Sequence, residues 1–360
     1  MNKSIKYNWV LVWMILIVSV VISGCSKIHK ESAENQKNIE VEGTLKAEEK
    51  LVFDEVVKDL SAWITYWDLD VNEEIKALDK QLKEISYFAA YFDDNNELTI
   101  PQQLVDYYEK TKDSDYIKYL TIVNDKINTD GTSLLKDTDL LRSSLTDSTL
   151  RSKHVNDIIN LAFQYGFDGI EIDYEQIKGD MSLWNNYILF ISELYNESKI
   201  AGLKVRVILE PNTPFEKLKF IEGPTYVMMC YNLNGGFSKP GEKANPKFIK
   251  DLISKMEKVP GNKSFAIATG GFNWGSDGKV SSLSEIQAKA LVKKYNVTEE
   301  VDGESQCKVF KYTDEAGVGH EVWYADKDTL NSWMKVISES GYGINLWRLG
   351  GNVFEEIDEI

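Results

Sequence analysis

The stretch that decides the fold runs from Phe167 to Glu175 and reads Phe-Asp-Gly-Ile-Glu-Ile-Asp-Tyr-Glu. From Gly169 onward, acidic and apolar side chains alternate, which is the period of a β-strand. Glu171, Asp173 and Glu175 are therefore predicted to share one face of the strand. Like charges on one strand face repel one another. Such a row of carboxylates is normally tolerated only where it is exposed to solvent, binds a cation, or shares protons among its members.

These three interpretations of the acidic row remain open at this point. Shared protons raise at least one pKa, which lets a carboxylic acid donate a proton near neutral pH. A solvated edge strand is the plain alternative, although apolar helix patterns flank the strand on both sides. A metal site is the third. No histidine lies near the motif, since the chain has only His29, His154 and His320. We therefore predict neither a metal nor an organic cofactor.

The same segment resembles the signature of glycoside hydrolase family 18, the chitinase-like family, whose pattern is Asp-x-x-Asp-x-Asp-x-Glu. Asp168, Glu171, Asp173 and Glu175 occupy its four positions, with Glu171 where the family usually has Asp. The resemblance implies a (β/α)8 barrel with the motif on its fourth strand. It also implies that Glu175 is the general acid and Asp173 its partner, and that Asp168 and Glu171 belong to the substrate-binding set.

Further positions extend the resemblance. The run Met229-Cys-Tyr231-Asn232 is similar to the family's Met-x-Tyr-Asp at the end of strand six, with Asn where Asp is frequent. By that resemblance Tyr231 is a catalytic residue that hydrogen-bonds the acetamido group of a sugar, and Met229 and Asn232 bind substrate. Trp347 resembles the family's tryptophan that forms the hydrophobic floor of the sugar subsite. Tyr66 is predicted to line the cleft. Core packing is the alternative for each aromatic residue and for Met229.

Strand-like and helix-like stretches alternate along the chain, which predicts an α/β fold and a closed (β/α)8 TIM barrel. The predicted strands are 61–67, 85–92, 119–124, 169–175, 202–210, 226–231, 264–269 and 343–347. The predicted helices are 73–84, 101–112, 148–165, 181–200, 215–221, 246–257 and 328–340. Residues 277–326 interrupt the alternation, and we predict there a small α+β insertion between strands seven and eight.

The first residues are typical of a targeting segment. Lys3 and Lys6 precede an uncharged, mostly apolar run over 9–22, which is short for a membrane-spanning helix. The run ends in a sequence that resembles a bacterial lipobox, in which Cys25 is lipidated. We predict a lipoprotein signal peptide at 1–24, a polar tether at 25–50, and the barrel at 51–360. An ordinary signal peptide with an incidental cysteine is the alternative.

The composition limits the classes of binding partner that are expected. The chain has 360 residues, a formal charge of −16 and 43% hydrophobic residues, as expected of a globular, acidic protein. The charge argues against nucleic acid as a partner and is compatible with an uncharged sugar. Cys230 and Cys307 are too few for a disulfide framework. Oligomeric state does not follow from the sequence.

The motif's resemblance implies a retaining glycosidase that uses substrate-assisted, oxazolinium-forming catalysis on β-1,4 bonds of N-acetylglucosamine-containing glycans. Peptidoglycan or chitooligosaccharide-like glycans are the expected substrates, and the ending around Trp347 looks closer to members acting on cell-wall or spore-cortex glycans. The expected location is the outer face of the bacterial cell membrane. Two alternatives remain: a catalytically inactive glycan-binding surface lipoprotein on the same barrel, and a surface protein whose barrel is mainly a scaffold.

Overall fold

A computed structural model describes residues 53, 57 and 59–354 of the chain. Eight parallel strands form a closed barrel in which each strand pairs with the next and the last returns to the first through the β15–β1 pairing. In order around the barrel these strands are β1 (Leu60–Thr65), β2 (Leu82–Phe92), β4 (Ile117–Ile127), β6 (Gly169–Asp173), β7 (Lys204–Leu209), β8 (Thr225–Met229), β9 (Lys263–Ala268) and β15 (Gly343–Trp347). The predicted (β/α)8 barrel is confirmed.

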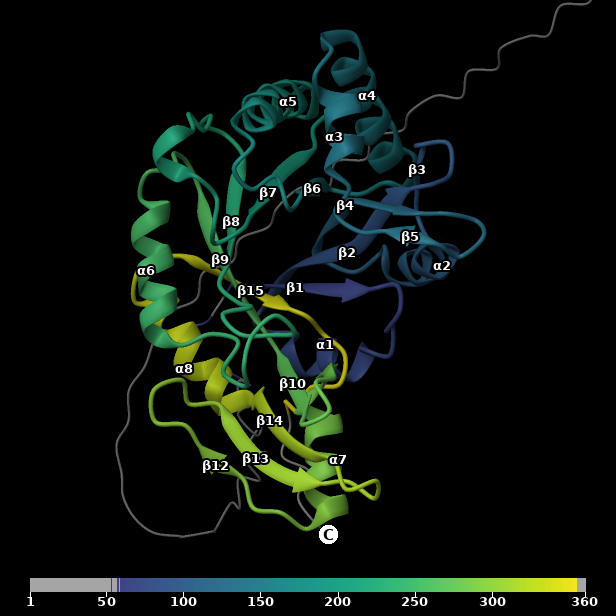
Figure 1. Cartoon of the computed structure of the whole chain (residues 1–360). Helices are drawn as coiled ribbons and strands as arrows, with labels where there is room; N and C mark the ends of the chain where they lie inside the picture. The colour runs from purple at the N-terminus through teal and green to yellow at the C-terminus, as the bar shows by residue number, and fades with distance from the viewer. Residues whose placement is uncertain (1–52, 54–56, 58, 355–360) are drawn as a thin grey trace, which may run out of the picture. The chain divides into compact units, whose positions relative to one another are not determined.

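Helices cover the outside of this barrel (Figure 1). They are α1 (Asn72–Leu78), α2 (Gln102–Thr111), α3 (Thr138–Leu145), α4 (Ser148–Tyr165), α5 (Met181–Ile200), η1 (Phe215–Lys217), α6 (Pro246–Met256) and α8 (Lys327–Ser338). Local signals set their ends. Asp147 caps α4 by accepting hydrogen bonds from two backbone N–H groups, and Gly166 ends the helix in a left-handed conformation.

The alternation predicted for the fourth strand is present in β6. On the outer side, Tyr174 directly follows the strand; its hydroxyl lies 2.7 Å from His154 Nε2, and its ring stacks on Phe190 of α5. On its inner face, Glu171 and Asp173 point into the barrel, where both are buried. The strand ends at Asp173, so Glu175 lies just beyond its carboxyl end rather than within it.

The insertion between strands seven and eight is confirmed as an α+β unit, and it is larger than the sequence indicated. A five-stranded antiparallel sheet packs on α7 (Glu285–Tyr295). The sheet contains β10 (Gly270–Gly275), β11 (Val280–Leu283), β12 (Glu300–Val301), β13 (Lys308–Thr313) and β14 (Gly319–Ala325). Its first strand, β10, precedes the predicted range and follows β9 almost directly. Two short strands, β3 (Leu98–Thr99) and β5 (Ser133–Leu134), pair with extensions of β2 and β4.

Candidate active site

The site lies at the carboxyl ends of the barrel strands, where enzymes of this architecture carry their chemistry. Asp173 is 7% exposed, and its Oδ1 has no hydrogen-bond partner among the described residues. Burial raises the pKa of Asp173 well above its usual range, the nearby Glu175 adds to the rise, and Lys136 opposes it. Asp173 therefore holds a proton more readily than an ordinary aspartate.

Glu175 is fixed by contacts at both its backbone and its side chain. Its backbone N–H donates to Asn124 Oδ1 at 2.9 Å, and its carbonyl accepts from Asn124 Nδ2 at 3.1 Å. Its Oε1 forms an ion pair with Lys136 Nζ at 2.5 Å. The side chain is 21% exposed, so the carboxyl group reaches the open face of the barrel. Asn124 thus fixes the backbone at Glu175, and Lys136 fixes the position of the Glu175 carboxylate.

Lys136 comes from the loop that follows β5 and enters the site in a left-handed backbone conformation, φ 59°. Its backbone N–H donates to Asp125 Oδ1 at 2.8 Å, and its Nζ lies 3.8 Å from the same oxygen. Burial lowers the pKa of Lys136, but the carboxylates of Asp173, Glu175 and Asp125 outweigh it, so the net shift is upward. The ammonium group is therefore charged throughout the physiological range.

Sequence reasoning missed Lys136 and Asn124. The available signal was the run Val123-Asn124-Asp125 in the predicted third strand, which departs from the Ser-x-Gly-Gly run that the resembled family has there. That departure puts a side chain with both a donor and an acceptor at position 124, which is what the Glu175 backbone uses.

We expect Lys136→Met to change the pH dependence of any activity at this site. Lys136 is the group that lowers the pKa of Asp173, so its removal lets that pKa rise further. Losing an adjacent opposite charge moves a carboxyl pKa by roughly 1–3 units. The limb of the pH–rate profile that reports Asp173 should therefore move to higher pH. Lys153→Met, at an exposed ion pair on α4, is the control. An unmoved profile in Lys136→Met would exclude this electrostatic role.

The predicted aromatic residues gather on the same face. Tyr231 and Met229 are each 7% exposed and pack in one cluster with Trp347. Burial raises the pKa of the Tyr231 hydroxyl, and Asp173 and Glu175 raise it further, which places this group in the field of both carboxylates. The Trp347 ring makes edge contacts with Trp63 at 5.7 Å and with Phe88 at 4.8 Å.

Asn232 and Tyr66 also lie on this face. Asn232 adopts a left-handed conformation, φ 61°, just after β8, and lines a pocket together with Trp347. Tyr66 follows β1 and packs against Trp67 and Tyr91. Burial raises the pKa of Tyr66, and Tyr91 and Asp125 add to it, so Tyr66 lies toward the Asp125 side of the face.

The structure does not bring Asp168 to this site. Asp168 precedes β6 and accepts a hydrogen bond from the backbone N–H of Lys118, near the start of β4. It borders a different pocket at the amino ends of the strands. Asp173 lies five positions farther along the chain, roughly 17 Å away in an extended strand. The prediction that Asp168 binds substrate here is wrong, because a strand carries its two ends to opposite faces of the barrel.

Glu171 points inward but lies too deep to meet a substrate. It is fully buried and pairs with Arg206 Nε at 3.0 Å. It also accepts hydrogen bonds from Trp63 Nε1, from Ser86 Oγ at 3.1 Å and from Thr121 Oγ1 at 2.8 Å. The predicted substrate-binding role is therefore corrected to a structural one: Glu171 neutralises a buried arginine in the barrel interior.

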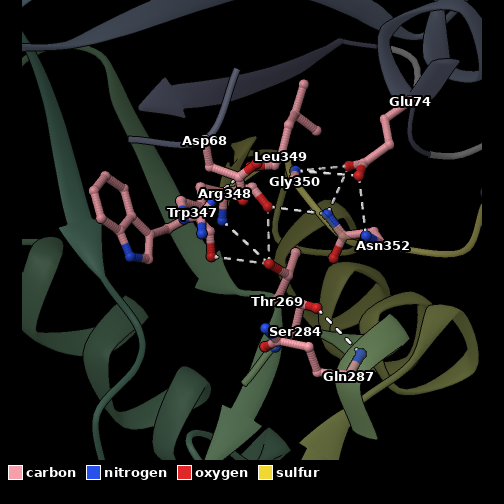
Figure 2. A network of polar contacts seen from close by, with 10 residues as sticks. All are labelled: Asp68, Glu74, Thr269, Ser284, Gln287, Trp347, Arg348, Leu349, Gly350 and Asn352. Atoms are coloured by element: carbon pink, nitrogen blue, oxygen red, sulfur yellow. Dashed lines mark hydrogen bonds and ion pairs between the residues drawn. The ribbon is translucent and has the colours of Figure 1, made fainter. Parts of the chain in front are cut away.

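The loop after β15 is anchored from several directions (Figure 2). Glu74 accepts hydrogen bonds from the backbone N–H groups of Gly350 and Asn352 and from Asn352 Nδ2 at 2.7 Å. Thr269 Oγ1 donates to the Arg348 carbonyl at 2.8 Å. In Figure 2 the Trp347 indole points away from this polar network. The loop thus presents Trp347 and Arg348 from a fixed backbone.

Several other predictions concern metals, cysteines and the membrane. Within residues 59–354, no group of three or more His, Cys, Asp or Glu residues is arranged to hold a metal ion. Cys230 and Cys307 are buried and are not bonded to each other. In the same part of the chain no helix is long and apolar enough to cross a bilayer. Cys25, the signal peptide and the tether lie outside the described residues.

Known proteins resemble the chain in sequence over part of its length. No protein-family model matches it. It is 27% identical over 232 residues to the cortical fragment-lytic enzyme of Bacillus anthracis, covering 59% of this chain and 53% of that protein. It is also 25% identical over 228 residues to the uncharacterized glycosylase YvbX of Bacillus subtilis, covering 59% of this chain and 66% of that protein. The chain thus spans about half the length of the first of these relatives.

Solved structures extend the likeness over most of the chain. The spore cortex-lytic enzyme SleL of Bacillus cereus superposes with a TM-score of 0.68 at 22% identity, covering 82% of this chain and 72% of that chain. The chain therefore has the (β/α)8 fold of barrels such as SleL and the chitinase of Chromobacterium violaceum. Cortex-lytic enzymes of Bacillus are among the proteins that the chain resembles in both sequence and structure.

Proposed function

We propose that this protein is a retaining glycosidase that hydrolyses β-1,4 bonds of N-acetylglucosamine-containing glycans by substrate-assisted catalysis. The observation that carries the proposal is the pairing of a buried Asp173, whose pKa is raised, with a partly exposed Glu175 two residues farther on. Similarity to a cortical fragment-lytic enzyme and to an uncharacterized glycosylase supports the same reaction class.

In the first step, Glu175 donates a proton to the glycosidic oxygen as the bond from that oxygen to the anomeric carbon breaks. The carbonyl oxygen of the sugar's own 2-acetamido group attacks the anomeric carbon and forms an oxazolinium ion. Asp173 orients the acetamide and stabilises its developing positive charge, and the Tyr231 hydroxyl hydrogen-bonds the same group. Trp347 supports the apolar face of the sugar ring.

In the second step, the Glu175 carboxylate takes a proton from water. The water oxygen bonds to the anomeric carbon as the bond to the acetamido oxygen breaks. The configuration at the anomeric carbon is retained, since the carbon is attacked twice. Lys136 holds Glu175 Oε1 in the free protein, which leaves Oε2 for the glycosidic oxygen.

A second candidate is a glycan-binding barrel without activity. The 2.5 Å ion pair between Lys136 Nζ and Glu175 Oε1 favours it, because the lysine occupies one of the two oxygens that could face the glycosidic bond. The experiment that separates the two is incubation of the purified protein with N-acetylglucosamine oligomers and with peptidoglycan fragments, followed by mass and NMR analysis of the products. Cleavage with a β-anomer as first product supports the glycosidase. Binding without cleavage supports the glycan-binding barrel without activity.

We also propose that the protein is exported and anchored to the outer face of the membrane through lipid on Cys25. The support is the lipobox-like end of the apolar run before Cys25. Stable anchoring takes more than one acyl chain. Cys25→Ser is therefore expected to move the protein from the membrane fraction to the soluble exported fraction, measured by fractionation and by labelling with a fatty acid. Cys230→Ser, at a buried position, is the control. Unchanged membrane association of Cys25→Ser would exclude the anchor.

A further inference from the structure

The strand-to-strand hydrogen bonding around β6 ends just before Glu175. The pairing of β6 with β7 runs up to Ile172, opposite Val207, and its pairing with β4 runs up to Asp173. The backbone N–H groups of Glu175 and Gln176 lie beyond both pairings, and backbone donors away from water need an acceptor. Side chains on or just after the two neighbouring strands accept hydrogen bonds from both groups.

Glu210 provides the acceptor on the β7 side. It directly follows the last residue of β7, and continuing the β6–β7 pairing by three residues on each chain places it beside Glu175. Its Oε2 accepts a hydrogen bond from the backbone N–H of Gln176 at 2.8 Å. Asn124 of β4 holds the backbone of Glu175 from the other side. Two consecutive residues are thus tied to opposite neighbours of β6.

The segment after Glu175 has a backbone that needs such support. Gln176 and Lys178 both adopt the left-handed conformation, with φ of 65° and 53°. Residues with a side chain rarely adopt this conformation, and it persists where the surroundings hold it. Trp184 of α5 holds the far end, because its Nε1 donates to the Lys178 carbonyl at 2.9 Å. Glu210 holds the near end, at the residue that follows Glu175.

The electrostatic surroundings also place Glu210 close to Glu175. Burial raises the pKa of the Glu210 carboxyl group, the hydrogen bond from Gln176 opposes the rise, and the charge of Glu175 adds to it. In the described part of the chain, no basic side chain forms an ion pair with Glu210. The backbone N–H of Gln176 is thus the group that holds this carboxylate.

We propose that Glu210 is a positioning residue for the general acid: it holds the backbone at Gln176 and thereby fixes where the Glu175 carboxyl group lies. The catalytic half of this inference rests on the proposed function, since it takes Glu175 as the acid. A misplacement of about 1 Å at a reacting group can lower a rate about 100-fold. A side chain that acts only through the backbone can therefore control the rate.

The kinetic test uses variants of Glu210. Glu210→Leu removes the acceptor and should lower kcat about 10- to 100-fold, with KM changed by less than about threefold. Glu210→Gln keeps an acceptor oxygen at the same reach and should recover most of the loss. Glu216→Leu, at a 73% exposed position on η1, is the control and should retain the wild-type kcat. Where Glu210→Leu does not fold, Glu210→Asp replaces it, because a side chain shorter by one methylene moves the acceptor away from Gln176.

A double-variant cycle shows whether Glu210 acts through Glu175. In Glu175→Gln, where the acid is already absent, the further change Glu210→Leu should leave the residual kcat within about twofold. A nitrophenol leaving group should likewise reduce the effect of Glu210→Leu, because its departure needs no proton. If Glu210→Leu lowers kcat by the same factor in both backgrounds, Glu210 acts independently of Glu175 and the proposal is overturned. Wild-type kcat in Glu210→Leu overturns it as well.

Amide hydrogen exchange measured by NMR tests the contact without any cleavage. The Gln176 amide should exchange slowly in the wild type and in Glu210→Gln, and at least about tenfold faster in Glu210→Leu. The Glu175 amide, held by Asn124, should change less. This result supports the contact even if no glycan is cleaved, in which case only the glycosidase proposal fails. Unchanged exchange at Gln176 in Glu210→Leu overturns the inference, whether or not the wild type is active.

Discussion

Glu175→Gln is expected to lower kcat for glycan cleavage by about 100- to 10,000-fold, the usual contribution of a positioned general acid. Glutamine keeps the size of the side chain and can still accept a hydrogen bond from Lys136, so the site retains its shape. It cannot donate a proton of useful acidity to the leaving oxygen. The loss should therefore fall on kcat, with the affinity for the glycan largely kept.

Steady-state kinetics on the glycan cut best by the wild type would measure this loss. Glu109→Gln, at an exposed ion pair on α2, is the matched control and should leave kcat within twofold of the wild type, because surface ion pairs contribute little. A leaving group that needs no protonation, such as a nitrophenol, should restore much of the rate in Glu175→Gln. Full activity of this variant on the natural glycan would remove Glu175 from the acid role.

Glu171→Gln is expected to lower the free energy of unfolding by about 3 kcal/mol, toward the lower end of the cost of breaking a buried ion pair. The change leaves the Arg206 guanidinium, which is 1% exposed, without its closest carboxylate. Glu84 remains 3.2 Å from Arg206 Nη1 and keeps part of the compensation, which is why the upper end of the range is not expected. Urea unfolding followed by tryptophan fluorescence measures the change as a lower midpoint at unchanged slope.

A double variant, Glu171→Leu with Arg206→Met, provides the internal control. Replacing both members of a buried pair by apolar side chains of similar volume is often neutral or stabilising. The double variant should therefore be more stable than Glu171→Gln. If Glu171→Gln unfolds at the wild-type midpoint, the ion pair contributes nothing to the barrel, and the reassignment of Glu171 to a structural role would fail.

Much of the fold followed from local signals. The ends of α4, α5 and β15 fall at the residues that the sequence indicated, because caps such as Asp147 and Gly166 act within a few residues. The end of α1 could not be predicted from local sequence signals. The predicted helix ran to residue 84, whereas β2 begins at Leu82 and pairs there with β1. A strand start that depends on a neighbour distant in sequence cannot be read from helix periodicity.

The insertion shows the same limit. The β part of the predicted insertion includes β13 and β14, whose alternation is local. The strand β10 was missed because its glycines look like a loop. A Cβ on Gly271 would lie 1.9 Å from the Trp323 carbonyl oxygen, so glycine is needed for β10 to approach β14. The need for glycine at this position becomes visible only when β10 is seen paired with β14, which is distant in sequence.

The sequence by itself predicted the strands and helices of the (β/α)8 barrel and the strand that carries the carboxylates, because period and spacing are properties of a single segment. The choice of Asp173 and Glu175 came from the resemblance to glycoside hydrolase family 18. The tertiary structure decided where each carboxylate lies and which groups it contacts. Asp168 lies at the opposite end of the barrel, and Glu171 is buried and paired with Arg206. The tertiary structure also brought Asn124 and Lys136 to Glu175. The physical reason is that the role of a charge depends on its depth and its partners, and in a closed barrel these come from neighbouring strands and the loops that follow them.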